Sequence, residues 1–168
     1  MELRELFLQQ LEREAASSRK MIERMPEGKN AWKPHERSME FGRLASLVAT
    51  MPGWIAIMIN TEELDVVAPS NDSLRTQPDA SRADLLQQLE EGLEKSRVAL
   101  KTTTDEHLMK PWRLKMGEQI LSEDPRYMAI ADGALCHLGH HRGQLTVYFR
   151  LLELQVPATY GPSADEMS

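Results

Sequence analysis

Apolar residues recur at helical spacing in four stretches of this chain, and the first stretch runs from Glu2 to about Met25. Charged residues fill the positions between the apolar ones, as in an amphipathic helix with one buried face. Pro26 and Gly28 follow, and both residue types commonly end helices. The pattern therefore predicts a long first helix. Its apolar positions are Leu3, Phe7, Leu11, Ala15 and Ile22.

The second stretch follows a polar loop, and Ser38 stands where a helix N-cap is expected. From there to Met58 the apolar residues again follow a helical period. Pro52 lies inside this stretch, and because proline has no amide hydrogen we predict a kink or a break there. The apolar positions are Phe41, Leu44, Leu47, Val48, Met51, Ile55 and Met58.

A third helix is predicted from Ser81 to about Leu100, because Ser81 and Asp84 have the spacing of a capping box. Before this helix, residues 62–80 are rich in proline and polar residues and show no period, which indicates a long crossover loop. After it, residues 112–121 are too few for another long helix. Gly117 suits the turn of a small hairpin or an extended arm.

The fourth helix is predicted to begin with Asp124 as its N-cap and Pro125 at its first position, and to run to about Leu154. Four long helices joined by one extended crossover predict an all-α fold, a four-helix bundle with a long crossover loop. The chain of 168 residues is long enough for one hydrophobic core. We therefore expect a single domain over residues 1–168.

Charge and composition narrow the classes of partner. The net charge of −6 repels a phosphate backbone, and no run of lysine and arginine offsets it, so we expect no nucleic-acid partner. The longest apolar stretch, around residues 54–59, is too short to cross a bilayer, so we expect no membrane partner. Cys136 is the single cysteine, and the N-terminus lacks the apolar segment of a signal peptide. These features indicate a soluble cytoplasmic protein.

Three of the five histidines lie within the segment HLGHHRGQLTVYFR of the predicted fourth helix. Histidine ligates metals and carries protons near neutral pH. At about 100° per residue, His141 falls about 40° from His137, and both share the apolar arc that should face the bundle. This spacing can offer two imidazoles to one ion, and it equally allows a buried pair that only hydrogen-bonds. Catalytic zinc usually has three protein ligands, so a third ligand has to come from elsewhere.

Other residues of this helix suggest supporting roles. Arg142 is expected to pair with a carboxylate, and Gln144 to hold a histidine tautomer. Tyr148 lies on the inward arc, where it or Arg142 could orient a substrate. Gly139 and Gly143 leave a shallow groove on the opposite face. Because glycine is unfavourable inside a helix, we expect another helix, of this chain or of a partner, to approach there.

The segment HLGHHRGQLTVYFRLLELQVPATYGPSADE closely resembles the C-terminal signature of the DinB-like family. WKPHERSMEFGRLASLVATMPGW and DEHLMKPWRL extend this resemblance over nearly the whole chain. The resemblance implies a four-helix bundle, commonly a homodimer, that holds a divalent ion such as zinc or nickel with three histidines. Two of those histidines match His137 and His141. Relatives in the family include thiol-dependent transferases and isomerases.

The third family ligand lies on the second helix, seven residues before a tryptophan that matches Trp54. Leu47 stands at that position in this chain and cannot coordinate a metal. Thr50 and Met51 lie one turn away and are poor ligands. The resemblance therefore implies a degenerate metal site, with Leu47 and Met51 in the pocket beside the two histidines.

Two functions follow from these residues. In the first, the chain is a divalent-metal-binding protein with zinc or nickel on His137 and His141 and an unassigned activity, such as that of a thiol-dependent transferase or hydrolase. In the second, it is a non-catalytic protein without metal that binds a small molecule or a protein partner. In both, the glycine groove and the family resemblance favour a homodimer.

Overall fold

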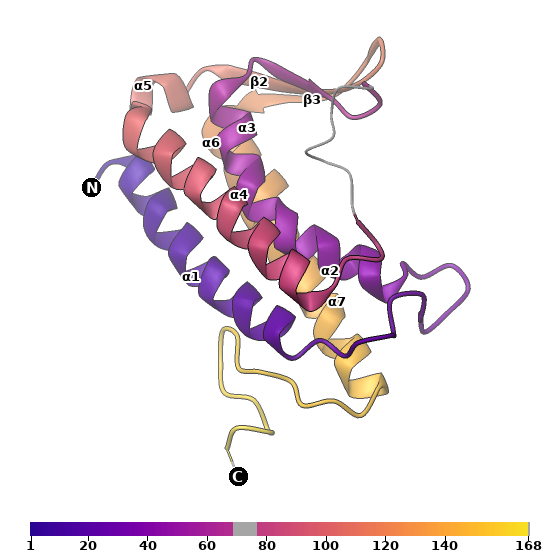
Figure 1. The fold of residues 1–168 in the computed structure, drawn as a ribbon. Helices are drawn as coiled ribbons and strands as arrows, with labels where there is room; N and C mark the ends of the chain where they lie inside the picture. Colours follow the sequence, from indigo (N-terminus) through magenta and orange to yellow (C-terminus); the bar gives the residue numbers. More distant parts are fainter. Residues whose placement is uncertain (69–76, 168) are drawn as a thin grey trace.

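A computed structural model describes residues 1–68 and 77–167, and helices make up most of it (Figure 1). The first helix, α1 (Leu3–Glu23), begins with a capping box in which the Glu2 and Glu5 side chains accept each other's backbone amides. It lies along α4 (Arg82–Thr102), which begins with the predicted capping box of Ser81 and Asp84. Both predicted helices are confirmed.

The second helical stretch is broken at the predicted proline. It consists of α2 (Phe41–Thr50), a 3₁₀ turn η1 (Met51–Gly53) and α3 (Trp54–Asn60). Pro52 lies in the 3₁₀ turn, as expected for a residue that cannot donate a helical hydrogen bond. The predicted cap at Ser38 is wrong. The helix begins at Phe41 without a side-chain cap, because the Phe41 amide donates to the Trp32 carbonyl at 2.8 Å.

Phe41–Asn60 is also long and apolar enough to cross a membrane by length and composition, with 20 residues and a mean hydropathy of 1.4. This apolar stretch is longer than residues 54–59, on which the sequence prediction rested. Its window is 67% buried by the rest of the protein. A core helix of a soluble protein meets the same criteria, so the segment is weak evidence for a membrane span.

A small three-stranded sheet corrects the all-α prediction. Strand β2 (Pro111–Met116) pairs in parallel with β1 (Glu63–Asp65) and antiparallel with β3 (Gln119–Pro125). The hairpin predicted at Gly117 is confirmed, and this glycine has a φ of 60°. Strand β1 replaces part of the predicted crossover loop, because Leu64 is buried beside the helices. Residues 69–76 of that loop lie outside the described residues.

A short helix, α5 (Asp105–Leu108), leads into the hairpin, and the last helical stretch follows it. That stretch consists of α6 (Arg126–Met128), a π-helix η3 (Ala129–Cys136) and α7 (His137–Leu151). The predicted cap at Asp124 is wrong, because Asp124 pairs with Trp112 in the sheet and Pro125 precedes the helix. After α7 the chain folds back past the lower ends of α1 and α7 (Figure 1).

The helices enclose an aliphatic core with aromatic rings at one end. Phe41 of α2 stacks on Phe149 of α7 at 5.9 Å between ring centroids. Near the middle of the core, η1 lies very close to α4. A Cβ on Gly92 of α4 would lie 3.2 Å from the Gly53 Cα of η1. The sheet covers the opposite end of the helices, beside α3 and α6 (Figure 1). It is there that the sheet and the π-helix enclose a pocket.

Candidate functional site

Three histidine rings gather where the π-helix passes into α7. The ring centroids of His137 and His141 lie 4.5 Å apart, and those of His140 and His141 lie 5.2 Å apart. His141 is buried, with 7% of its surface exposed, whereas His137 and His140 are exposed. The inward position predicted for His137 is therefore wrong. The prediction assumed a uniform α-helix, but the turn before His137 is π-helical.

Gln144 orients the buried imidazole, as the sequence predicts. His141 Nδ1 lies 2.9 Å from Gln144 Oε1. An amide oxygen only accepts hydrogen bonds, so this arrangement places the proton on Nδ1 and leaves the Nε2 lone pair free. Burial lowers the pKa of His141 below its ordinary value, and the bond to Gln144 opposes that shift. Burial thus favours the neutral form of His141.

Arg142 and Tyr148 point to other parts of the molecule. Arg142 is almost fully buried and forms the predicted ion pair, with Glu14 of α1 as its carboxylate. It also donates to the Tyr160 hydroxyl at 2.6 Å, which fastens the C-terminal segment. Tyr148 donates to the Met39 carbonyl at 2.9 Å. The structure therefore brings neither side chain to the pocket beside His137.

Within the described residues, the outer face of α7 at Gly139 and Gly143 is not covered by another helix, contrary to the prediction. A Cβ on Gly139 would lie 2.9 Å from the Tyr160 hydroxyl, and a Cβ on Gly143 would meet nothing within 4 Å. The expected helix is therefore replaced at Gly139 by the chain's own C-terminal segment. Gly143 faces open space within this protomer.

The donor set does not fit a metal centre with three protein ligands. Among the described residues, no group of three or more histidine, cysteine or acidic side chains is arranged to hold an ion. Leu47 is partly buried and packs on the core, and Met51 is fully buried in η1. The histidine pair alone offers two nitrogen donors, one fewer than catalytic zinc usually has.

A pocket of about 470 Å³ opens between α3, the sheet and the π-helix, and His137 stands on its wall. We call it the His137 pocket. The π-helix gives it three of its lining residues just before α7. The full lining is Trp54, Ile57, Met58, Leu64, Val66, Trp112, Leu114, Ser122, Asp124, Met128, Ala129, Asp132, Gly133 and His137.

Two indole rings line the His137 pocket. Trp54 contacts His137 edge-on, with 6.0 Å between ring centroids. Trp112 is 3% exposed, and its Nε1 donates to Thr61 Oγ1 at 3.1 Å. Neither tryptophan was predicted from the sequence to line a pocket. The two tryptophans line the same cavity because the hairpin that carries Trp112 folds back over α3.

Asp132 is a pocket residue that the sequence pattern does not reveal. Five positions before His137, it would lie about 140° away from it on a regular α-helix. In the π-helix the His137 amide donates to the Asp132 carbonyl, and both residues line the same pocket. No residue type signals a π-helix in a single sequence, so this pairing could not be predicted.

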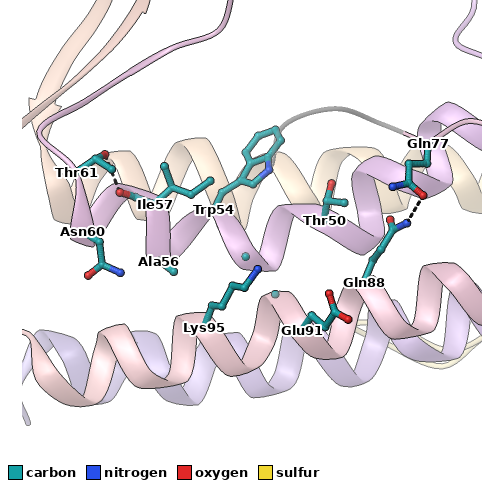
Figure 2. Close-up of a pocket in the computed structure, with 12 residues that line it drawn as sticks. Thr50, Trp54, Ala56, Ile57, Asn60, Thr61, Gln77, Gln88, Glu91 and Lys95 are labelled. Carbon is teal, nitrogen blue, oxygen red and sulfur yellow. Dashed lines mark hydrogen bonds between the residues drawn. The ribbon is translucent and has the colours of Figure 1, made fainter. Parts of the chain in front are cut away.

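A second pocket, of about 490 Å³, lies between α3 and α4. Figure 2 shows Lys95 reaching from α4 toward the η1 turn, with Glu91 one turn earlier on the same helix. Gln88 of this wall donates to Gln77 Oε1 at 2.9 Å. This pocket is more polar than the His137 pocket and holds none of the predicted site residues.

Comparison with known proteins identifies the family. The DinB family model matches residues 1–168. The chain belongs to the DinB family. A DinB-like protein from Bacillus cereus ATCC 10987 has the same fold, with a TM-score of 0.66 and 21% identity over 92% of this chain and 95% of that one.

A DinB-like protein from Bacillus subtilis is equally similar, with a TM-score of 0.65 and 20% identity over 88% of this chain and 92% of that one. Identities this low establish a shared DinB-like fold and carry no activity with them. The comparison with curated proteins gives no match.

Proposed function

We propose that this DinB-family protein binds a small, mostly apolar molecule in the His137 pocket. The observation that carries the proposal is a cavity of about 470 Å³ walled by two tryptophans and several aliphatic side chains, with few polar groups. Ligand sites in proteins are typically concave, about 300–1,000 Å³ in volume, mainly apolar and provided with a few polar groups that fix orientation.

The walls of the pocket come from parts of the chain that are separately anchored. The hydrogen bond to Thr61 holds Trp112. Gly133 has no side chain of its own, and a Cβ there would lie 3.2 Å from the Met58 methyl group. A pocket assembled from α3, the sheet and the π-helix is available without rearrangement, which reduces the entropy cost of binding. The long helical segments then serve as the scaffold of a four-helix bundle.

A screen of aromatic fragments, followed by calorimetry, tests this proposal. We expect fragments that bind the wild type to lose at least tenfold in affinity when Ser122→Phe fills the pocket from β3. Gln119→Phe places the same ring on the same exposed strand outside the pocket lining and should leave affinity unchanged. Equal affinity for both variants and the wild type would place the fragments elsewhere and reject the proposal.

Divalent metal binding by His137 and His141 is a second candidate. It is favoured by the 4.5 Å separation of their rings and by the free Nε2 of His141. A four-ligand zinc site yields roughly 10–16 kcal/mol, so two ligands give about 5–8 kcal/mol, which corresponds to a Kd between about one micromolar and a few hundred micromolar. We therefore propose a weak zinc or nickel site that needs further ligands from solution.

Elemental analysis of tag-free protein tests whether the metal is held weakly or tightly. Less than a tenth of an equivalent of zinc or nickel after gel filtration is expected from a two-ligand site. Stoichiometric metal that disappears in His141→Ala would instead support a metalloprotein with an additional ligand.

Light scattering of the same sample tests the homodimer that we also propose, and a mass near 19.1 kDa would exclude it.

A further inference from the structure

The charged groups on the wall of the His137 pocket all have the same sign. Among the described lining residues, Asp124 and Asp132 are the only charged side chains, and neither lysine nor arginine is present. No hydrogen bond or ion pair is formed by either carboxylate within the described parts of the chain. Two unpaired carboxylates on a mainly apolar wall create a negative potential that is focused into the cavity.

Neighbouring basic residues are already committed to other acceptors. Arg126 is fully buried, donates to the Thr61 and Pro111 carbonyls and pairs with Glu62 at 2.8 Å. In the sheet, Arg113 pairs with Glu123 at 2.9 Å, and Lys115 pairs with Glu63 at 2.6 Å. These cations therefore do not neutralise the two aspartates of the pocket.

The aromatic walls favour the same ligand charge. Indole faces attract cations, and tryptophan is the best aromatic partner for an ammonium group. Trp54 and Trp112 both line the pocket, and the buried Trp112 ring is held by its bond to Thr61. Carboxylates and indoles that line one cavity are a combination that recognises an organic ammonium group, while the aliphatic residues receive an apolar body.

We infer that the ligand of the His137 pocket is an apolar amine, with a protonated amino group directed to Asp124 and Asp132 and a hydrocarbon or aromatic body among the apolar side chains. This inference rests on the proposed small-molecule function. It adds the charge of the ligand, which neither the family nor the histidines specify.

A matched series of indole ligands tests the inference at pH 7. The indole series is tryptamine as the cation, 3-propylindole as the neutral isostere and indole-3-propionate as the anion. By calorimetry, the wild-type protein should bind the cation with at least tenfold higher affinity than the neutral compound. The anion should have the lowest affinity of the three. Equal binding of cation and neutral compound, or tightest binding of the anion, would overturn the inference while leaving the proposed function intact.

Charge-removing variants locate the preference. Asp124→Asn with Asp132→Asn should reduce tryptamine affinity at least tenfold and leave 3-propylindole affinity unchanged. Glu106→Gln removes an exposed carboxylate outside the pocket and should change neither. If the double variant keeps the tryptamine preference, the aspartates are not its source and the inference fails. If the double variant does not fold, the ranking on the wild type decides. If none of the three indole ligands binds at millimolar concentration, the proposed function fails as well.

Discussion

His141 keeps its imidazole inside the protein while its two neighbours in the histidine cluster face solvent. Burial lowers the pKa of His141, so the folded protein disfavours its protonation. The stabilising effect of the neutral ring is complete above the ordinary histidine value of about 6.5. It is lost as the pH falls through that value toward the lower folded-state pKa, because the unfolded chain then binds the proton more tightly.

We therefore predict that urea unfolding gives a lower free energy of unfolding at pH 5.5 than at pH 7.5, and that His141→Gln reduces this difference. His140→Gln removes an exposed imidazole from the same turn and should retain the wild-type difference. An unchanged pH dependence in His141→Gln would show that other groups cause the loss of stability.

Leu47→His restores the residue that the family resemblance places on the second helix. Without metal, the variant should be less stable than the wild type by about 1–3 kcal/mol, because a partly buried position receives a polar group without an assured partner. An ion that binds only the folded state raises the melting temperature by mass action. We predict a larger zinc- or nickel-dependent melting shift for Leu47→His than for the wild type. Tight metal binding by the wild type with no gain in the variant would reveal an unidentified ligand.

For single residues, the sequence predicted hydrogen-bond and ion-pair partners better than it predicted which residues line the pocket. The spacing of Gln144 from His141 and the need of Arg142 for a carboxylate were enough to predict their bonds. Asp132 and Trp112 reach the same cavity through a π-helix and a hairpin. Neither contact has a short-range signal, so both were missed.

Two glycines in long helices allow a matched test of element packing. In α4, a Cβ on Gly92 would lie 3.2 Å from the Gly53 backbone, whereas in α7 a Cβ on Gly143 would meet nothing within 4 Å. Gly92→Ala should destabilise the fold by about 1–3 kcal/mol, since neither backbone can yield freely. Gly143→Ala should stabilise it by about 1 kcal/mol, because alanine has the higher helix propensity. Chemical denaturation measures both, and equal effects would contradict the close contact between η1 and α4.

The elements themselves follow from the sequence where one physical rule dominates. Periodic apolar positions predicted α1 and α4, and Pro52 predicted the break between α2 and α3. Strand β1 was missed because three residues are too few for an alternating pattern and its partner lies far along the chain. The all-α expectation failed for that reason.

At the scale of the whole molecule, the sheet and the C-terminal segment cover opposite ends of the helices (Figure 1). The two ends have different aromatic content. Trp54 and Trp112 line the His137 pocket beneath the sheet, while Trp32 packs edge-on against Tyr148 at 5.5 Å. The chain therefore carries two tryptophan reporters in the proposed site and one outside it, and it has no others.

The indole N–H signals of ¹⁵N-labelled protein, followed by NMR during titration with neutral 3-propylindole, test the small-molecule site most directly. This probe carries no charge, so the result does not depend on the preference for amines. We predict saturable shifts of the Trp54 and Trp112 signals and an unchanged Trp32 signal. Shifts confined to Trp32, or no shift of any indole signal at millimolar ligand, would contradict a ligand site in the His137 pocket.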